Sequence, residues 1–279
     1  MSKILKTIKF PKTNKNVCLA LSGGLDSVVL LYALVQNYGA DRVKCLSFDY
    51  NQRHSVELEY AKKHAEALGV YHKLVDISYL SSIVPEVSSL VKGSGLKVLS
   101  SDESFATEKN DVNTYVPWRN GQFAMIEASF AEANDCNYIF QATNAADVYG
   151  YFDWTLKFRN AMNKVFDLNP RHKIKLVTPF SKFKKEQIVK LGLELESLMN
   201  KDIIDKTWSC YAANNNKECG ICNSCTEKLK GFIKAKVDMP RILKMFNITR
   251  EQFEEIRKEL KNARESWSTT KSIREIIRI

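Results

Sequence analysis

Six consecutive residues, Ser22-Gly23-Gly24-Leu25-Asp26-Ser27, have the composition of a loop that binds phosphate. They lie between an apolar run, 17–21, and a segment, 27–36, that has apolar residues at helical spacing. Glycines at a strand-to-helix turn let the backbone bend sharply and approach a ligand, and the helix start presents unpaired N–H groups to an anion. The stretch predicts a phosphate-binding loop. The structural alternative is a tight turn whose Ser or Asp caps the helix.

A second group of reactive side chains consists of four of the seven cysteines, and it falls within 210–225. These four are Cys210, Cys219, Cys222 and Cys225. Because no apolar signal core precedes them, their C-x-x-C spacing indicates a metal rather than disulfides. Four thiolates suit a closed, tetrahedral zinc site with a structural role, although an iron–sulfur cluster uses the same ligands. We expect zinc, because nothing else in the chain indicates electron transfer.

The hydrophobic pattern predicts the elements that position these groups. Short apolar runs alternate with amphipathic segments. The runs are 17–21, 43–49, 70–76, 138–143 and 174–178, and the segments are 26–37, 55–68, 120–134 and 184–195. This alternation predicts an α/β fold with a doubly wound parallel sheet. Ligands of such sheets bind beyond the carboxyl ends of the strands, so we expect the glycine turn, 49–54 and 143–153 to meet there.

The chain divides into two parts in this reading. Residues 1–207 hold the predicted sheet, and 208–279 hold the cysteine cluster followed by charged helical segments. We interpret the second part as a zinc knot with a helical appendage. Residues 78–114, rich in Ser, Gly, Asp and Asn, predict an insertion that acts as a lid.

Composition limits the classes of protein to which the chain can belong. Of its 279 residues 44% are hydrophobic and 27% are charged, which is enough for a sizeable core. No segment has the apolar length of a membrane span, and the N-terminal segment predicts a cytoplasmic protein. A formal net charge of +10 favours a polyanionic ligand, RNA or an acidic partner, or simply a soluble surface.

Three further stretches complete a pattern with the glycine turn and the cysteines. They are Tyr50-Asn51-Gln52-Arg53-His54, Tyr115-Val116-Pro117-Trp118-Arg119-Asn120, and Asn144-x2-Asp147 with Gly150-Tyr151-x-Asp153. With WSCY…CGICNSC (208–225), they resemble in order the motifs of the 7-cyano-7-deazaguanine synthase family. In that family the glycine turn is the PP-loop of N-type ATP pyrophosphatases. The resemblance covers about residues 17–226, and we expect a homodimer of the queuosine pathway.

The resemblance implies a reaction. ATP and Mg²⁺ activate 7-carboxy-7-deazaguanine as an acyl-adenylate, ammonia converts it to the amide, and a second ATP gives the nitrile. Charge on the departing pyrophosphate is stabilised by the loop, and Arg53, Arg119 and Lys185 are candidates to neutralise phosphate or carboxylate charge. The implied ATP-binding residues are Leu21, Ser22, Gly23, Gly24, Leu25, Asp26, Ser27, Arg53 and Lys185. The implied substrate-binding residues are Arg119, Asn120, Asn144, Asp147, Tyr151 and Asp153, and catalytic roles are implied for Asp26, Ser22, Arg119 and Asp153.

Several of these residues also have structural interpretations. Arg53 and His54 precede a predicted helix and are suited to capping it. Asp147 and Asp153 are typical turn residues. Lys185 lies in a basic stretch, where a solvated side chain is the alternative to phosphate binding.

The chain departs from the family pattern around the expected substrate. Trp118 stands where the family usually has Gly, and Trp154-Thr155 stand where it usually has Cys-Arg. These changes leave ATP activation intact and concern the substrate or acceptor. Two alternatives therefore stay open. One is a diverged ligase that joins a deazaguanine to another amine, such as that of a protein partner, in antiphage defence. The other is a non-catalytic module that binds RNA, against which the intact SGGLDS argues.

Overall fold

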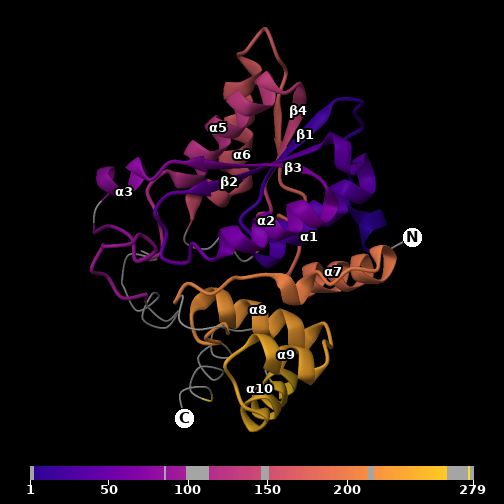
Figure 1. Ribbon diagram of the computed structural model, residues 1–279, viewed down its shortest axis with the longest axis vertical. Coiled ribbons are helices and arrows are strands. Elements are labelled where there is room, and N and C mark those ends of the chain that lie inside the picture. Colours follow the sequence, from indigo (N-terminus) through magenta and orange to yellow (C-terminus); the bar gives the residue numbers. More distant parts are fainter. Residues whose placement is uncertain are drawn as a thin grey trace.

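A five-stranded parallel sheet lies at the centre of the upper part of the molecule in the computed structural model (Figure 1). The structure describes residues 3–84, 86–98, 113–145, 151–212, 217–262 and 276. The strand order is β3-β2-β1-β4-β5, and every neighbouring pair is parallel. The strands are β1 (Asn16–Ala20), β2 (Val43–Asp49), β3 (Tyr71–Asp76), β4 (Cys136–Phe140) and β5 (Lys175–Val177). The order reverses at β1, so the ligand-binding crevice is expected beside that strand.

Helices cover both faces of this sheet. Buried side chains of α1 (Leu25–Tyr38), α2 (Glu57–Leu68) and α7 (Lys185–Met199) belong to one apolar cluster. Those of α5 (Arg119–Ala133) and α6 (Leu156–Asp167) belong to a second cluster. The predicted doubly wound α/β fold is therefore confirmed.

The local sequence explains why these elements form. The three central residues of β1 are fully buried, as expected for a parallel strand covered on both faces. Helix α1 is apolar nearly all round because it lies between the sheet and α7. Helix α6 begins at Thr155, whose hydroxyl accepts a hydrogen bond from the Phe158 N–H at 3.1 Å.

Three helices begin at or after the end of the cysteine segment. They are α8 (Asn223–Lys234), α9 (Met239–Met245) and α10 (Arg250–Asn262). The first, α8, packs against α7, and the last, α10, packs on α8 and α9 (Figure 1). Phe232 and Phe246 are fully buried in the cluster that contains α1 and α7. Arg241 of α9 also pairs with Glu196 of α7 at 2.9 Å. Side chains from both predicted parts of the chain therefore share one hydrophobic core. The division into 1–207 and 208–279 stays a prediction.

The remaining described elements are short. Helix α3 spans Tyr79–Ile83, and single 3-10 turns span Leu5–Thr7, Ala40–Arg42, Phe152–Trp154 and Ile204–Lys206. Within the predicted lid, Leu80, Leu90 and Val91 are buried against the sheet, whereas 99–112 lie outside the described residues. No helix among the described residues has the length and apolarity that a membrane span requires.

Candidate active site

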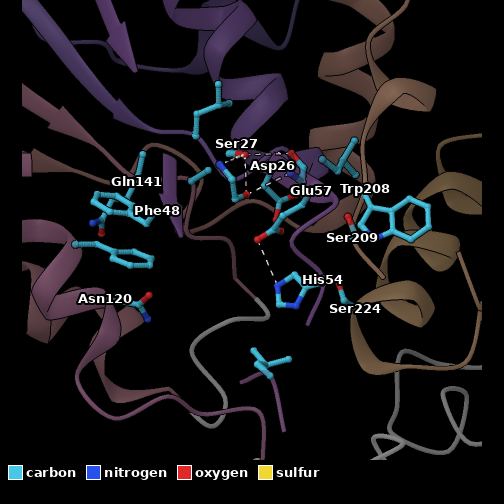
Figure 2. A pocket seen from close by; sticks show the side chains of 18 of the residues that line it. Asp26, Ser27, Phe48, His54, Glu57, Asn120, Gln141, Trp208, Ser209 and Ser224 are labelled. Carbon is cyan, nitrogen blue, oxygen red and sulfur yellow. Dashed lines mark hydrogen bonds and ion pairs between the residues drawn. The ribbon is translucent and has the colours of Figure 1, made fainter. Parts of the chain in front are cut away.

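A cavity of about 220 Å³ lies at the carboxyl end of β1, where the strand order reverses (Figure 2). Nine of the predicted site residues line it. They are Leu21, Ser22, Gly24, Leu25, Asp26, Ser27, Arg119, Asn120 and Lys185. The structure therefore brings the glycine turn together with the start of α5 and the start of α7, as the parallel topology predicts.

The glycine turn is fixed from several sides. Gly23 has φ +88°, and a Cβ there would lie 2.0 Å from the backbone oxygen of Glu57, so only glycine fits. The hydroxyls of Ser22 and Ser27 are 3.0 Å apart, and Ser27 Oγ donates to the Gly24 carbonyl at 3.1 Å. The Trp208 N–H donates to the Gly23 carbonyl at 3.1 Å, which ties the cysteine segment to the turn. These contacts hold the first turn of α1 open to the cavity.

Asp26 joins three distant parts of the chain. Its Oδ2 accepts from Lys185 Nζ at 2.6 Å and from Asn144 Nδ2 at 2.8 Å. Its Oδ1 is buried and has no hydrogen-bond partner among the described residues. Gly231 of α8 packs against Lys185 so closely that a Cβ would lie 2.6 Å from Lys185 Cγ. Asp26 therefore keeps one carboxylate oxygen for a ligand, while the other holds an ammonium group in place.

Arg119 supplies the second cationic group of the cavity. Its Nη1 donates to the Tyr50 hydroxyl at 2.8 Å, and the guanidinium lies over the rings of Tyr50 and Phe123. Burial lowers the pKa of Arg119, but the neighbouring phenols and Asp153 raise it more, so the net pKa is raised. Nε has no hydrogen-bond partner in the described part of the chain. Arg119 is therefore a fixed, permanently charged donor that can bind a carboxylate or a phosphate.

The imidazole of His54 and the carboxylate of Glu57 face each other in the cavity, with His54 Nε2 3.3 Å from Glu57 Oε1 (Figure 2). Both side chains are largely buried. Glu57 Oε1 also accepts a long hydrogen bond from Gln52 Nε2 at 3.4 Å. The pair comes from the turn after β2 and the first turn of α2.

Five predicted residues of the described chain are not among those that line the cavity: Gly23, Arg53, Asn144, Tyr151 and Asp153. Arg53 donates to the Leu96 carbonyl at 2.7 Å and so holds the chain segment after β3. Tyr151 hydrogen-bonds Thr114. Asp153 Oδ2 accepts from the Asn120 N–H at 3.2 Å, and burial raises the pKa of Asp153 against the opposing effect of Arg119. Asp147 lies outside the described residues.

The two tryptophans that depart from the family pattern lie in different places. Trp154 lines the cavity. Trp118 is 60% exposed and lies outside the lining, with its ring centroid 5.0 Å from that of Phe152. Of the two, only Trp154 adds an aromatic surface to the described cavity wall.

Sequence reasoning missed several lining residues. Gln141, Phe123, Glu57 and Ser224 line the cavity, yet none belongs to the predicted sets. Gln141 and Phe123 sit in segments that read as a strand and a helix, so they look like scaffold. Glu57 follows His54 by three residues, and this spacing within one helical turn is the signal that finds the pair.

The four cysteines form a compact cluster. Their sulfurs all lie within 4.8 Å of one another, and Cys219 Sγ is 3.8 Å from Cys225 Sγ. Two backbone N–H groups point at these sulfurs: that of Cys222 donates to Cys219 Sγ at 3.3 Å, and that of Cys219 donates to Cys210 Sγ at 3.5 Å. Such N–H···S bonds orient thiolates that bind a metal. The cluster could therefore hold a metal.

Comparisons with known proteins point to one family. The family model of queuosine biosynthesis protein QueC matches residues 15–236. The 7-cyano-7-deazaguanine synthase of Caldicellulosiruptor saccharolyticus is 38% identical over 224 residues, which are 80% of this chain and 92% of that protein. The synthase of Leptospira biflexa is 31% identical over 251 residues, 85% of this chain and 97% of that protein.

A solved structure also aligns with this chain. The U34-tRNA thiolase NcsA from Methanococcus maripaludis, with its 4Fe-4S cluster, aligns with a TM-score of 0.44 and 19% identity. The alignment covers 70% of this chain and 61% of that chain.

Proposed function

The chain belongs to the QueC family of queuosine biosynthesis proteins, and we propose that it is an ATP-dependent carbon–nitrogen ligase that converts 7-carboxy-7-deazaguanine to 7-cyano-7-deazaguanine. In this proposal the substrate carboxylate attacks the α-phosphate of ATP to form an acyl-adenylate, and pyrophosphate leaves. Ammonia then gives the amide, and a second ATP removes the amide oxygen.

The observation that carries the proposal is the arrangement around Asp26. One cavity contains a helix start suited to phosphate, the ammonium group of Lys185 and the guanidinium of Arg119. The helix N-terminus and Lys185 would stabilise the charge of the departing pyrophosphate. Arg119 would hold the substrate carboxylate or the α-phosphate as a charged donor. Asn120, whose Oδ1 is buried without a hydrogen-bond partner among the described residues, would bind a donor of the heterocycle.

Magnesium fits the free oxygen of Asp26. Mg²⁺ prefers one or two carboxylates together with substrate phosphates, and Asp26 Oδ1 is buried, unpaired in the described chain and adjacent to the phosphate loop. When bound, the ion would neutralise charge on the phosphates. Lys185 and Asn144 would keep the carboxylate oriented for that role through its other oxygen.

Zinc fits the cysteine cluster. Bonds of about 2.3 Å to four sulfurs place tetrahedral ligands about 3.8 Å apart, and the Cys219–Cys225 sulfur separation is 3.8 Å. A cluster of four irons occupies more space than a single ion, so its thiolates lie farther apart. We therefore propose a structural zinc, which would hold Trp208 and its bond to the glycine turn in place.

A direct assay tests the proposed reaction. Purified protein is given ATP, Mg²⁺, ammonium and 7-carboxy-7-deazaguanine, and the small molecules are followed by mass spectrometry. We expect many turnovers to the nitrile. Absence of both AMP and nitrile from folded, metal-loaded protein would refute the proposal.

The position of Trp154 favours one second candidate, a ligase that uses another amine. An indole in the cavity wall, at a position that follows Asp153, changes the space available to the acceptor. If a protein amine is the acceptor, AMP forms with ATP and substrate, ammonium yields no nitrile, and a conjugate appears only when a partner protein is added. Nitrile formation with ammonium alone excludes this candidate.

A further inference from the structure

His54 is placed in the cavity as a proton acceptor would be. Its side chain is largely buried, lines the cavity, and has Nε2 3.3 Å from Glu57 Oε1 (Figure 2). Nδ1 is also buried and has no hydrogen-bond partner in the described ranges. A buried ring nitrogen without a partner costs free energy unless a ligand or water meets it. Packing within the described residues therefore leaves Nδ1 of His54 without a partner.

The carboxylate of Glu57 decides which ring nitrogen is available. A carboxylate only accepts hydrogen bonds, so a neutral imidazole beside it carries its proton on Nε2. Nδ1 is then the lone-pair nitrogen, and Glu57 stabilises the imidazolium that forms when Nδ1 takes a proton. This is the arrangement of a base that is held by a third group.

The proposed reaction needs such a base. When ammonia attacks an acyl-adenylate, the new nitrogen is positively charged and must lose a proton before the amide forms. The other charged groups of the cavity are unsuited to accept that proton. Lys185 and Arg119 are cationic. Asp26 Oδ2 is held by two donors, and its Oδ1 is the oxygen proposed for magnesium. Glu57 Oε1 already faces His54 Nε2 and Gln52 Nε2.

Resting on the proposed function, we propose that His54 is the general base of the amide-forming step and that Glu57 is its positioning residue. Ammonia forms a C–N bond to the carbonyl carbon, and His54 Nδ1 takes one proton from that nitrogen. The C–O bond to AMP then breaks, and its electron pair leaves with the AMP oxygen. The products are the amide, AMP and an imidazolium paired with Glu57, which releases its proton to water.

The structural interpretation of His54, as a residue that only precedes helix α2, makes a different prediction. In that case the side chain affects stability or ATP binding, and its loss lowers the rates of adenylation and of amide formation by the same factor. A general base affects only the half that consumes ammonia. The two interpretations therefore separate when the half-reactions are measured individually.

The test compares His54→Gln with wild type and with His172→Gln. His172 donates from Nε2 to the Cys136 carbonyl at 2.8 Å and lies outside the cavity lining, so it controls for the same chemical change. Adenylation is measured without ammonia, as substrate-dependent exchange of labelled pyrophosphate into ATP. Amide formation is measured in a single turnover with ammonium. For His54→Gln we expect exchange within about threefold of wild type and amide formation slowed about 10²-fold or more.

Hydroxylamine supplies a second readout. The protonated nitrogen of its tetrahedral adduct is more acidic than that of the ammonia adduct. Its proton can therefore pass to water directly, and the reaction depends less on a general base. We expect the defect of His54→Gln to shrink several-fold with hydroxylamine as the nucleophile. A defect of the same size with both nucleophiles contradicts proton removal by His54.

The other outcomes also decide the matter. Equal losses in exchange and amide formation, or amide formation near the wild-type rate, overturn the proposal. If His54→Gln does not fold, Glu57→Gln tests the same pair: we expect amide formation to fall about tenfold with exchange retained, and unchanged amide formation refutes the role of the pair. If wild type itself shows no exchange and no amide, the proposed function has failed rather than this inference.

Discussion

Glu127 offers a sharp test of the structure because it is a fully buried acid beneath the cavity. It lies on α5, and its Oε2 accepts from Gln141 Nε2 at 2.7 Å, while Oε1 has no hydrogen-bond partner among the described residues. Burial raises the pKa of Glu127 from 4.5 to about 8, although hydrogen bonds from Gln141 and the Ala20 backbone lower it. The perturbation that removes this titration is Glu127→Gln, which keeps the shape and leaves an amide acceptor for Gln141.

The magnitude follows from proton linkage. Between pH 4.5 and about 8, Glu127 is protonated in the folded protein and ionised in the unfolded chain. The free energy of unfolding therefore falls as pH rises through this range. The contribution of Glu127 is fully present below pH 4.5, is lost progressively as pH rises to about 8, and is constant above that. At about 1.4 kcal/mol per pH unit, the total loss is about 5 kcal/mol. Glu127→Gln should therefore become more stable relative to wild type with increasing pH.

Urea unfolding at fixed pH values measures this difference. Between pH 5 and pH 8 we expect the free energy of unfolding of Glu127→Gln, relative to wild type, to rise by about 4 kcal/mol. Other buried acids with a raised pKa, Asp153 and Glu218, titrate in both proteins and cancel in the difference. Parallel pH curves for the two proteins would show that Glu127 is not a buried acid with a raised pKa, and the described packing of α5 on β4 would be wrong.

Three further changes test the site and the metal cluster. Asp26→Ala should lower release of AMP and pyrophosphate at least 10²-fold while the protein stays folded, with some loss of stability because Lys185 loses its partner; near-normal pyrophosphate release by the folded variant contradicts a role in ATP cleavage. Gly23→Ala should destabilise the protein by about 2 kcal/mol or more in thermal melting, because its Cβ would overlap the Glu57 carbonyl, whereas Gly24→Ala, whose Cβ lies 3.3 Å from Ser22 Oγ, should cost less. Cys222→Ser should reduce zinc below one ion per chain by elemental analysis and lower the melting temperature; a full complement of metal refutes the assigned ligands.

Periodicity was sufficient to predict the scaffold from the sequence. Buried parallel strands are short and apolar, and the predicted run at 43–49 coincides with β2. The sequence pattern did not predict helix α6. Thr155 caps this helix through the Phe158 N–H, but it directly follows a stretch whose residue types are typical of a loop. Patterns of this kind are local, and so they can be recognised in one sequence.

Pairings between distant residues could not be predicted in the same way. Lys185 looks solvated in a basic stretch, yet it lies 2.6 Å from Asp26, a residue 159 positions earlier in the chain. The buried pair of Glu127 and Gln141 is hidden for the same reason, since each sits in an apparently ordinary helix or strand. Burial and charge pairing arise when elements pack, and a single sequence does not show which polar residues will meet.

The backbone conformation at Trp118 determines where this departure from the family pattern acts. Its φ is +56°, a left-handed conformation that costs a non-glycine residue about 1 kcal/mol, so a glycine would be less strained here. The indole lies near the rings of Phe152 and Phe158 and stays 60% exposed. A tryptophan here therefore reshapes the protein surface at the start of α5. It does so without entering the described cavity wall, which Trp154 lines.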